Sequence, residues 1–526
     1  MFRSTPVSNF DMLSLSIFLP LSIWAAVVWL AYTFNVYLKR KSHAKSHGCE
    51  EPTTLKQESF LGYGMLRDSF EALRNSTYLR LGKQRFDENG NTFAFKQMGK
   101  LGVLTNDPIN VRAILSTQFQ DFGVGKRRAE AFEPLIGHGI FTADGASWEK
   151  ARKSVKPSFS RGQLDDISTF ETHLQNFVAS LPGEAEAIDL QPLFQGLTLD
   201  VSTDFLFGES TNVLGSAKAA SAGRSFANAF DDAQKTVVNA FALGPVGWLD
   251  PRSNFRQDQK TVKDFMSGYV DKALNTEKSD APHQQDGKYS FASEFAKLTD
   301  DRAMIRGGLL NLLLAGRDTT ASLLSNLFFM LAKQPDVYSK LAAEIRSTVP
   351  TANEAPSLEA LKSMKYLRAC INESLRLHPP IPRNSREALR DTTLPVGGGA
   401  DGTAPILVPK GTQVGYQVFS MHRRKDVYGE DADEFVPERW IERNLRPGWA
   451  FLPFNGGPRI CIGQQFAINL ASYVVCRLVQ RFERVESCDP GPWEEGLGIT
   501  CSTKNGTLVR LCRRDAWETS DVSANE

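Results

Sequence analysis

The chain has 526 residues, of which 41% are hydrophobic, 23% charged and 10% aromatic. This is close to average globular usage and excludes collagen-like, coiled-coil and wholly disordered chains. The 61 Lys and Arg residues nearly balance the 60 Asp and Glu residues, so no basic excess indicates a nucleic acid partner. Seven cysteines at uneven spacing predict a reducing compartment rather than a disulfide framework.

The first predicted element is an uncharged, mostly apolar run at residues 12–34. As a helix it is long enough to cross about 30 Å of hydrocarbon. A cleavable signal peptide is the alternative, but the run is too long for one and no small-residue cleavage site follows it. Four Lys and Arg residues between positions 39 and 45 follow the run, whereas only Arg3 precedes it. The positive-inside rule therefore predicts a single anchor that leaves the C-terminal part in the cytosol.

Helical patterns recur along most of the remaining chain, and strand-like runs such as 92–95 and 414–418 are short and few. The polar stretch 275–288 predicts an exposed loop. We therefore expect a mainly α-helical domain with small β-sheets. The predicted organisation is a lumenal N-terminus at 1–11, a transmembrane anchor at 12–34, a linker at 35–59, a catalytic domain at 60–514 and a frayed C-terminal tail at 515–526.

Trp148 and Arg152 lie four residues apart in a predicted helix. Both side chains therefore share one face and can reach the same partner. An ordinary cation–π pair between the two is the alternative.

The longest apolar helical pattern runs from Asp300 to Lys333, with acidic residues at its start and Pro335 after its end. Inside it, residues 315–320 read Ala-Gly-Arg-Asp-Thr-Thr. Adjacent threonines are poor helix formers, so they indicate a local role. The simplest role is a hydrogen bond from Thr319 back to the preceding turn.

Two further motifs follow. Glu373 and Arg376 form an i, i+3 acid–base pair, which is most often only a solvated helix face. Residues 454–463 read Phe-Asn-Gly-Gly-Pro-Arg-Ile-Cys-Ile-Gly, and the glycines and proline predict a tight turn before a helix that begins at about Gln464. Cys461 would then lie at a helix N-terminus, where free N–H groups stabilise a thiolate. A lone buried cysteine is the alternative.

The complete pattern at 454–463 resembles the cysteine-ligand loop of the cytochrome P450 superfamily of haem-thiolate monooxygenases. The other motifs lie in the order that this superfamily requires, and the resemblance covers nearly all of residues 60–514. It implies the cytochrome P450 fold, with the long helix over a haem b whose iron is bound by Cys461. It also implies a buried structural triad of Glu373, Arg376 and Arg439.

The resemblance implies roles for further residues. Ala315 and Gly316 would let the long helix open beside the iron, Thr319 would hydrogen-bond the bound oxygen, and Asp318 would help to deliver protons. The thiolate would push electron density toward O–O cleavage. The residues expected to contact the cofactor are Trp148, Arg152, Arg386, Arg459, Ala315, Gly316 and Phe454.

No flavin or nicotinamide motif is present, so electrons from NADPH must come through another protein. The resemblance and the anchor together imply a membrane-bound NADPH–cytochrome reductase and an endoplasmic reticulum location. A basic cluster beside the Trp148 helix could dock an acidic face of that reductase, although a solvated basic face is the alternative. The cluster consists of Lys150, Lys153, Lys156 and Arg161.

The stretches 379–386, 394–402 and 422–429 resemble fungal hydroxylases of alkanes and fatty acids. They favour a lipophilic substrate and terminal or near-terminal hydroxylation of a long aliphatic chain. The alternatives are tailoring of a polyketide or terpenoid in secondary metabolism, a haem-thiolate isomerase or dehydratase that needs no O2, and a non-catalytic haem-binding membrane protein. Apolar residues expected over the haem, which could equally be core, are Phe119, Phe122, Phe132, Ile140 and Phe141.

Overall fold

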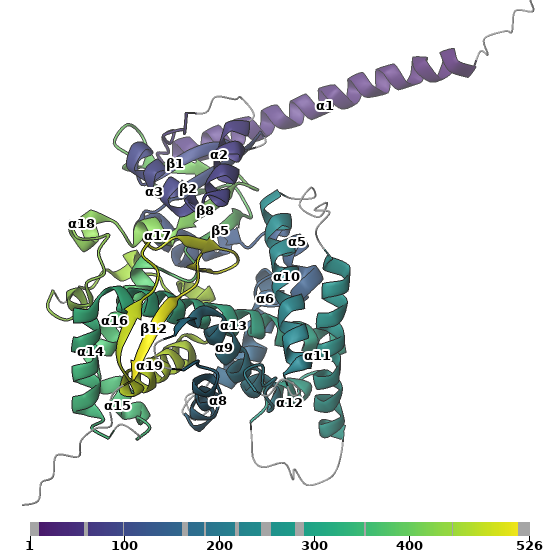
Figure 1. The fold of residues 1–526 in the computed structure, drawn as a ribbon. Helices are drawn as coiled ribbons and strands as arrows, with labels where there is room; N and C mark the ends of the chain where they lie inside the picture. Colours follow the sequence, from purple (N-terminus) through teal and green to yellow (C-terminus); the bar gives the residue numbers. More distant parts are fainter. Residues whose placement is uncertain are drawn as a thin grey trace, which may run out of the picture.

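The protein is mainly helical and carries several small sheets (Figure 1). The computed structural model describes residues 10–56, 62–97, 99–159, 167–183, 186–215, 220–243, 254–278, 289–351, 354–443 and 445–513. Residues 1–9 of the predicted N-terminus, Arg161 of the basic cluster and the predicted tail at 515–526 lie outside these ranges. The expected mainly α fold with small sheets is confirmed.

The main helices are spread over the whole described chain. The N-terminal ones are α1 (Phe10–Ser46), α2 (Tyr63–Arg74), α3 (Tyr78–Asn89), α5 (Lys126–Ile136), α6 (Gly145–Val155), α8 (Ser168–Ala179), α9 (Leu190–Phe207), α10 (Ser221–Leu243) and α11 (Phe255–Lys278). The C-terminal ones are α12 (Phe291–Ala296), α13 (Arg302–Lys333), α14 (Pro335–Thr348), α15 (Leu358–Ser363), α16 (Lys365–Leu377) and α19 (Gln464–Arg481).

Helix α13 is the long helix that the sequence predicts, and it runs through the middle of the fold (Figure 1). Its start is fixed by Asp301, whose carboxylate accepts hydrogen bonds from the N–H groups of Ala303 at 2.8 Å and Met304 at 3.2 Å. Leucine and phenylalanine side chains along its C-terminal half pack into the largest hydrophobic core, which also unites α8, α9, α14, α16 and α19. Burial on nearly every face explains why the helix is apolar all round.

The principal sheet has five strands in the order β1-β2-β8-β5-β3. They are β1 (Thr92–Gln97), β2 (Lys100–Thr105), β3 (Phe122–Gly123), β5 (Arg383–Ala388) and β8 (Gln413–Gln417). The predicted strands at 92–95 and 414–418 are therefore present in β1 and β8, although Val418 already begins the short α17 (Val418–Met421). The pair β2–β8 is parallel and the others are antiparallel.

Three smaller sheets complete the fold. One has the order β4-β12-β9, from Ala187–Asp189, Leu508–Arg513 and Phe482–Ser487. The others are the pair β6 (Thr392–Gly398) with β7 (Ala404–Val408), and the hairpin of β10 (Glu495–Leu497) with β11 (Cys501–Thr503). The β10–β11 hairpin brings the chain back beside α13, where it borders the cavity described below.

Helix α1 projects away from the rest of the molecule (Figure 1). It continues to Ser46, so the first part of the predicted linker is helical. Its end is tied to the domain because Arg40 Nη2 lies 3.1 Å from Asp391 Oδ1. Within the described residues, no helix is both long enough and apolar enough to span a membrane. The predicted anchor at 12–34 falls partly outside this description, since side chains before Ser22 are not described.

The predicted loop at 275–288 begins later than the sequence suggests. Helix α11 extends to Lys278, and residues 279–288 lie outside the described part of the chain. The pattern misplaced this boundary because polar residues at a helix end resemble those of a loop.

Candidate functional site

The segment before Cys461 forms the tight turn that its glycines and proline predict. A short 3₁₀ turn spans Gly457–Arg459, and α19 begins at Gln464. Gly457 has φ +65°, and a Cβ there would overlap the backbone carbonyl of Leu115, so only glycine fits. The Cys461 N–H donates to the Phe454 carbonyl at 2.9 Å, which closes the turn.

The Cys461 thiol is exposed on the ligand-free protein surface but lies among closely packed groups. Its side chain is accessible to a water-sized probe, yet its surroundings are dense enough that burial raises the thiol pKa. The Gly463 N–H and Arg152 favour the thiolate and offset part of this effect. The helix-end stabilisation predicted from the sequence is thus present, but burial outweighs it while no cation is bound to the sulfur.

One face of α13 also borders an open space. Ala315, Gly316, Asp318 and Thr319 are partly accessible, whereas their neighbours Leu314, Arg317 and Thr320 are buried. The helix is continuous through 315–320, and the Thr319 hydroxyl donates to the Ala315 carbonyl at 2.6 Å. The expected opening of the helix is therefore not seen.

The absence of a side chain at Gly316 allows a close helix contact. A Cβ at Gly316 would lie 3.1 Å from Ser202 Oγ on α9, tighter than most real contacts. Gly316 therefore permits close approach of α9 to α13, which is a different task from making room beside an iron.

The Asp318 carboxyl lies in a charged cluster at the junction of α13 and α10. Burial raises its pKa, and Asp231 adds to the rise, whereas Arg317 and a hydrogen bond with Gln234 oppose it. Arg317 is 3% exposed. Its Nη1 and Nη2 both donate to the Asp231 carboxylate, with Nη2–Oδ2 at 3.0 Å. Asp318 therefore holds its proton to a higher pH than an ordinary carboxyl group does.

Trp148, Arg152 and Arg459 meet at one place, as the sequence predicts. The Trp148 ring is buried on α6, with the Arg459 guanidinium 4.4 Å and the Arg152 guanidinium 5.8 Å from its centroid. The Arg459 Nη2 donates to Asp144 Oδ1 at 2.6 Å and to the Ala143 carbonyl at 2.9 Å. Its Nε has no hydrogen-bond partner among the described residues.

Arg386 joins this cluster together with Arg128, which sequence reasoning missed. Both donate to Asn384 Oδ1, Arg128 Nη2 at 2.7 Å and Arg386 Nη1 at 3.2 Å. Burial first, and then the neighbouring arginines, lower the pKa of Arg128 and of Arg459 to about 10. No sequence motif surrounds Arg128; only the approach of α5 to β5 places it here.

Among the remaining expected contacts, Phe454 packs at the edge of the main core. The Phe119 ring lies 5.4 Å from that of Trp148. Phe122 is 2% exposed in the core beside the principal sheet, so for this residue the core alternative holds. Phe132, Ile140 and Phe141 are partly buried against a separate core of α10, α11 and α13.

The predicted buried triad is confirmed. Glu373 Oε1 lies 2.8 Å from Arg376 Nη2 and 2.9 Å from Arg439 Nε, and all three side chains are fully buried. The Trp440 indole N–H and the Val436 N–H also donate to this carboxylate, at 2.9 and 2.8 Å. The triad thus ties α16 to the chain segment after residue 430.

His422 connects this triad to the cysteine segment, a role that sequence reasoning did not assign. Its Nδ1 lies 3.1 Å from the Arg376 carbonyl, and its Nε2 accepts from the Leu452 N–H at 2.8 Å. Burial lowers the pKa of His422 to about 3, so the ring is neutral, with the proton on Nδ1. Leu452 lies nine residues before Cys461 in the printed sequence.

Comparison with known proteins agrees with this arrangement of fold and thiol. The model of the family described as cytochrome P450 matches residues 71–509. Cytochrome P450 monooxygenase fsdH of Fusarium heterosporum is 38% identical over 95% of this chain and 89% of its own length. Monooxygenase himC of Aspergillus japonicus is 41% identical (93% and 88%), and cytochrome P450 52A3-B of Candida maltosa is 41% identical (93% and 97%).

The chain therefore belongs to the cytochrome P450 family. It is a monooxygenase, and hence an oxidoreductase, that binds haem b through a thiolate and receives NADPH electrons from a reductase. O2 and a lipophilic substrate are its reactants. These findings confirm the monooxygenase interpretation rather than the O2-independent or non-catalytic ones.

The arginine cluster fits the two carboxylates of haem. The described groups near it include one close carboxylate, Asp144, against four guanidinium groups. The Arg459 Nε remains without a partner. Bidentate guanidinium groups are the side chains best suited to carboxylates. A dianionic ligand would therefore neutralise a charge excess that the protein alone leaves in place.

Proposed function

We propose that Cys461 is the thiolate ligand of the haem and that the arginine cluster holds the haem carboxylates. The cluster comprises Arg128, Arg152, Arg386 and Arg459, with Trp148 between two of them. Support comes from the accessible thiol, which the Gly463 N–H and Arg152 favour as a thiolate, and from the excess of positive charge beside α6. Phe454 would border the cofactor, because its carbonyl closes the turn at Cys461.

When bound, a thiolate-ligated haem supplies the redox chemistry that activates O2. The protein's own contribution lies on the accessible face of α13. Asp318, whose burial favours the protonated acid, would pass a proton to the adjacent Thr319. The Thr319 hydroxyl, now bonded to the Ala315 carbonyl, would turn to present that proton toward the O2 site. The small side chain of Ala315 would leave that space open.

Substitution of Cys461 by serine tests the first assignment. The reduced wild-type protein should give the red-shifted carbon monoxide band of thiolate-ligated haem, and Cys461→Ser should abolish that band. Cys476, which lies on α19 and is buried in the main core, provides the matched control, because Cys476→Ser should keep the band. A carbon monoxide band in Cys461→Ser at the wild-type position would refute the assignment.

For the reaction, we propose terminal or near-terminal hydroxylation of a long aliphatic chain. Apolar side chains near α6 and α13, such as Phe119 and Phe141, would favour such a chain by about 0.8 kcal/mol per buried CH2. Haem difference spectra of microsomes with alkanes, fatty acids and polycyclic metabolites would test this. A response confined to polycyclic compounds would instead select the second candidate, tailoring of a polyketide or terpenoid, which the polar cavity described below favours.

We also propose that Lys150, Lys153 and Lys156 dock the reductase. All three are exposed on or just after α6, next to the arginine cluster, so the electron donor would approach close to the haem carboxylates. Charge reversal at Lys153 and Lys156 should slow reduction at low salt without changing substrate affinity. Lys362→Glu, at an exposed position on α15, is the control. Equal reduction rates in all variants would rule out this surface.

Finally, we propose that residues 12–34 anchor the protein in the endoplasmic reticulum membrane, with the catalytic domain in the cytosol. Helix α1 projects from the domain (Figure 1), and it exposes Trp24 at 69%, Trp29 at 64% and Phe34 at 62%. Such exposed apolar surface marks a binding partner or a lipid phase. Removal of residues 1–35 should release the protein from alkaline-washed microsomes, and continued retention would contradict the anchor.

A further inference from the structure

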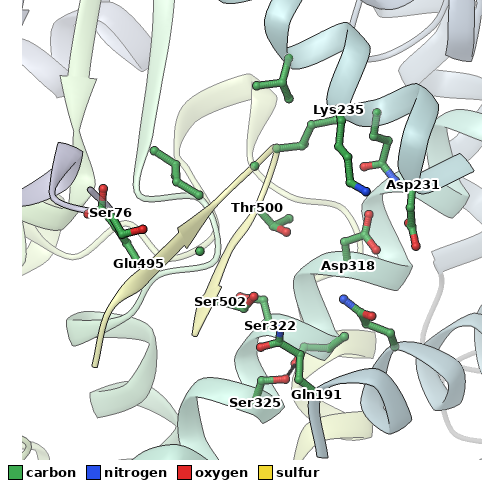
Figure 2. A pocket seen from close by; sticks show the side chains of 18 of the residues that line it. Ser76, Gln191, Asp231, Lys235, Asp318, Ser322, Ser325, Glu495, Thr500 and Ser502 are labelled. Carbon is green, nitrogen blue, oxygen red and sulfur yellow. Dashed lines mark hydrogen bonds between the residues drawn. The ribbon is translucent and has the colours of Figure 1, made fainter. Parts of the chain in front are cut away.

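A cavity of about 630 Å³ lies beside the accessible face of α13. Figure 2 shows its walls: Asp318 projects from α13, Asp231 and Lys235 project from α10, and the β10–β11 hairpin with Thr500 and Ser502 borders the other side. The residues that line this cavity do not include the expected haem contacts, although Asp318 lies close to Gly316 on α13. Asp318 is the residue that this cavity shares with the proposed catalytic pair.

Most of the side chains that line this cavity are polar. They include carboxyl, hydroxyl and amide groups from α10, α13 and the hairpin. Ligand pockets for lipophilic molecules are lined mainly by apolar side chains. A bare hydrocarbon placed here would strip water from polar groups without replacing their hydrogen bonds, which costs more than the chain gains by burial. A plain alkane is therefore a poor occupant.

The charged groups of the cavity already have protein partners. Asp231 pairs with Arg317, and Lys235 Nζ lies 2.8 Å from Asp232 Oδ1. Glu495 accepts the Leu79 N–H at 2.9 Å. A carboxylate ligand would meet the carboxylates of Asp231 and Glu495 and a single, already paired ammonium group, so charge disfavours it. Uncharged hydroxyl and carbonyl groups meet no such repulsion.

The cavity meets the proposed catalytic pair at Asp318. Asp318 lines the cavity, and Thr319 is the next residue on the same helix, with Cα atoms about 3.8 Å apart. A molecule that spans this corner of α13 could place an aliphatic carbon beside Thr319 and its polar part between α10 and the hairpin.

We propose that this cavity binds the uncharged, oxygen-bearing part of the substrate, through hydroxyl or carbonyl groups that face Thr500, Ser502 and Gln234. The inference rests on the proposed hydroxylation and narrows its substrate class. The substrate is then an aliphatic molecule that already carries neutral oxygen functions, rather than an alkane or a free fatty acid. An earlier acyl transfer or oxidation would have to supply such a molecule.

The test uses the haem-loaded full-length protein and three probes with the same chain: hexadecane, hexadecanoate and the glycerol monoester of hexadecanoic acid. Dissociation constants come from the shift of the haem absorption band. We expect the glycerol ester to bind at least about tenfold more tightly than either other probe, the effect of one or two net hydrogen bonds. Equal affinities, or tighter binding of hexadecanoate, would overturn the proposal.

A double variant locates the effect. Thr500→Val with Ser502→Ala removes two hydroxyl groups at nearly constant volume and should weaken binding of the glycerol ester about tenfold while leaving hexadecane unchanged. Thr172→Val, at an exposed position on α8, is the control and should change neither. An unchanged ester affinity in the double variant would refute this location.

The two levels of inference fail in different ways. If the wild-type protein shows no carbon monoxide band of thiolate-ligated haem, both the proposed reaction site and this inference are wrong. Hydroxylation of hexadecane with an intact band, but no preference for the ester, would leave the proposed reaction in place and overturn only the assignment of the cavity.

Discussion

Two groups of arginines in this protein differ in how their charge is balanced. Behind the cysteine segment, Arg376 and Arg439 share the carboxylate of Glu373 and donate to backbone carbonyls, and all three side chains are fully buried. Beside α6, Arg128 and Arg459 are enclosed among other arginines, and burial first and the like charges second lower their pKa. The first group is complete within the chain, whereas the second has a charge excess that a ligand must neutralise.

The difference separates the structural arginines from those that we propose bind the haem carboxylates. Buried charges are tolerated when every one has a partner, and removal of one partner is then costly. Like charges held together without enough counter-charge weaken the ligand-free protein and favour an anion. Residue type alone does not distinguish the two cases, because both consist of arginines enclosed by the fold.

Loss of the shared carboxylate should give the largest effect. Glu373→Gln leaves the buried Arg376 without its anion and Arg439 with only Asp431, 3.2 Å from its Nη1, and should lower the free energy of unfolding by about 3–5 kcal/mol. Urea titration followed by tryptophan fluorescence measures this. Glu434→Gln, at an exposed position in the same segment, should change the free energy by less than about 0.5 kcal/mol. Similar values for the two variants would mean that the triad contributes no special stability.

Acid should destabilise the folded protein around the Glu373 triad, because His422 there becomes protonated on unfolding. The folded pKa of His422 is about 3, below the ordinary value of about 6.5. The unfolded chain therefore binds a proton first, and stability is lost as the pH falls from about 6.5 toward 3. The loss is about 1.4 kcal/mol per pH unit, or about 2 kcal/mol between pH 6.5 and 5.

His422→Gln isolates this contribution, because its amide can replace both ring hydrogen bonds without titrating. Its unfolding free energy should fall less steeply with acid than that of the wild type, while its carbon monoxide band stays intact. His422→Phe, which cannot donate to the Arg376 carbonyl or accept from Leu452, should lose part of that band. Parallel pH profiles for the wild type and His422→Gln would contradict a neutral, buried His422.

Loss of an arginine from the second group should have a smaller effect of a different kind. Arg128→Met relieves repulsion with Arg386 and Arg459, so the unfolding free energy of the haem-free protein should change by less than about 1 kcal/mol or rise. Haem affinity should fall about tenfold, equivalent to about 1.4 kcal/mol, as measured by transfer to a haem scavenger. A loss of stability as large as that of Glu373→Gln would remove the distinction between the two groups.

Motifs that are local in the chain were predicted well. Trp148 and Arg152 share a helix face because they lie four residues apart, and Asp301 begins α13 because its carboxylate bonds the first free N–H groups. Long-range neighbours were not predictable in this way. Arg128 reaches Asn384 across 256 positions, and His422 meets Leu452 through a turn that no sequence period describes.

The sequence by itself determined the class of protein, because the cysteine motif, its turn and the long helix depend on bonds and spacings within short segments. The tertiary structure decided which arginines have counter-charges, that Gly316 serves close packing of α9, and that a polar cavity adjoins α13. These properties depend on distances between segments that are far apart in the chain. Charge balance and free volume arise only when those segments pack against one another.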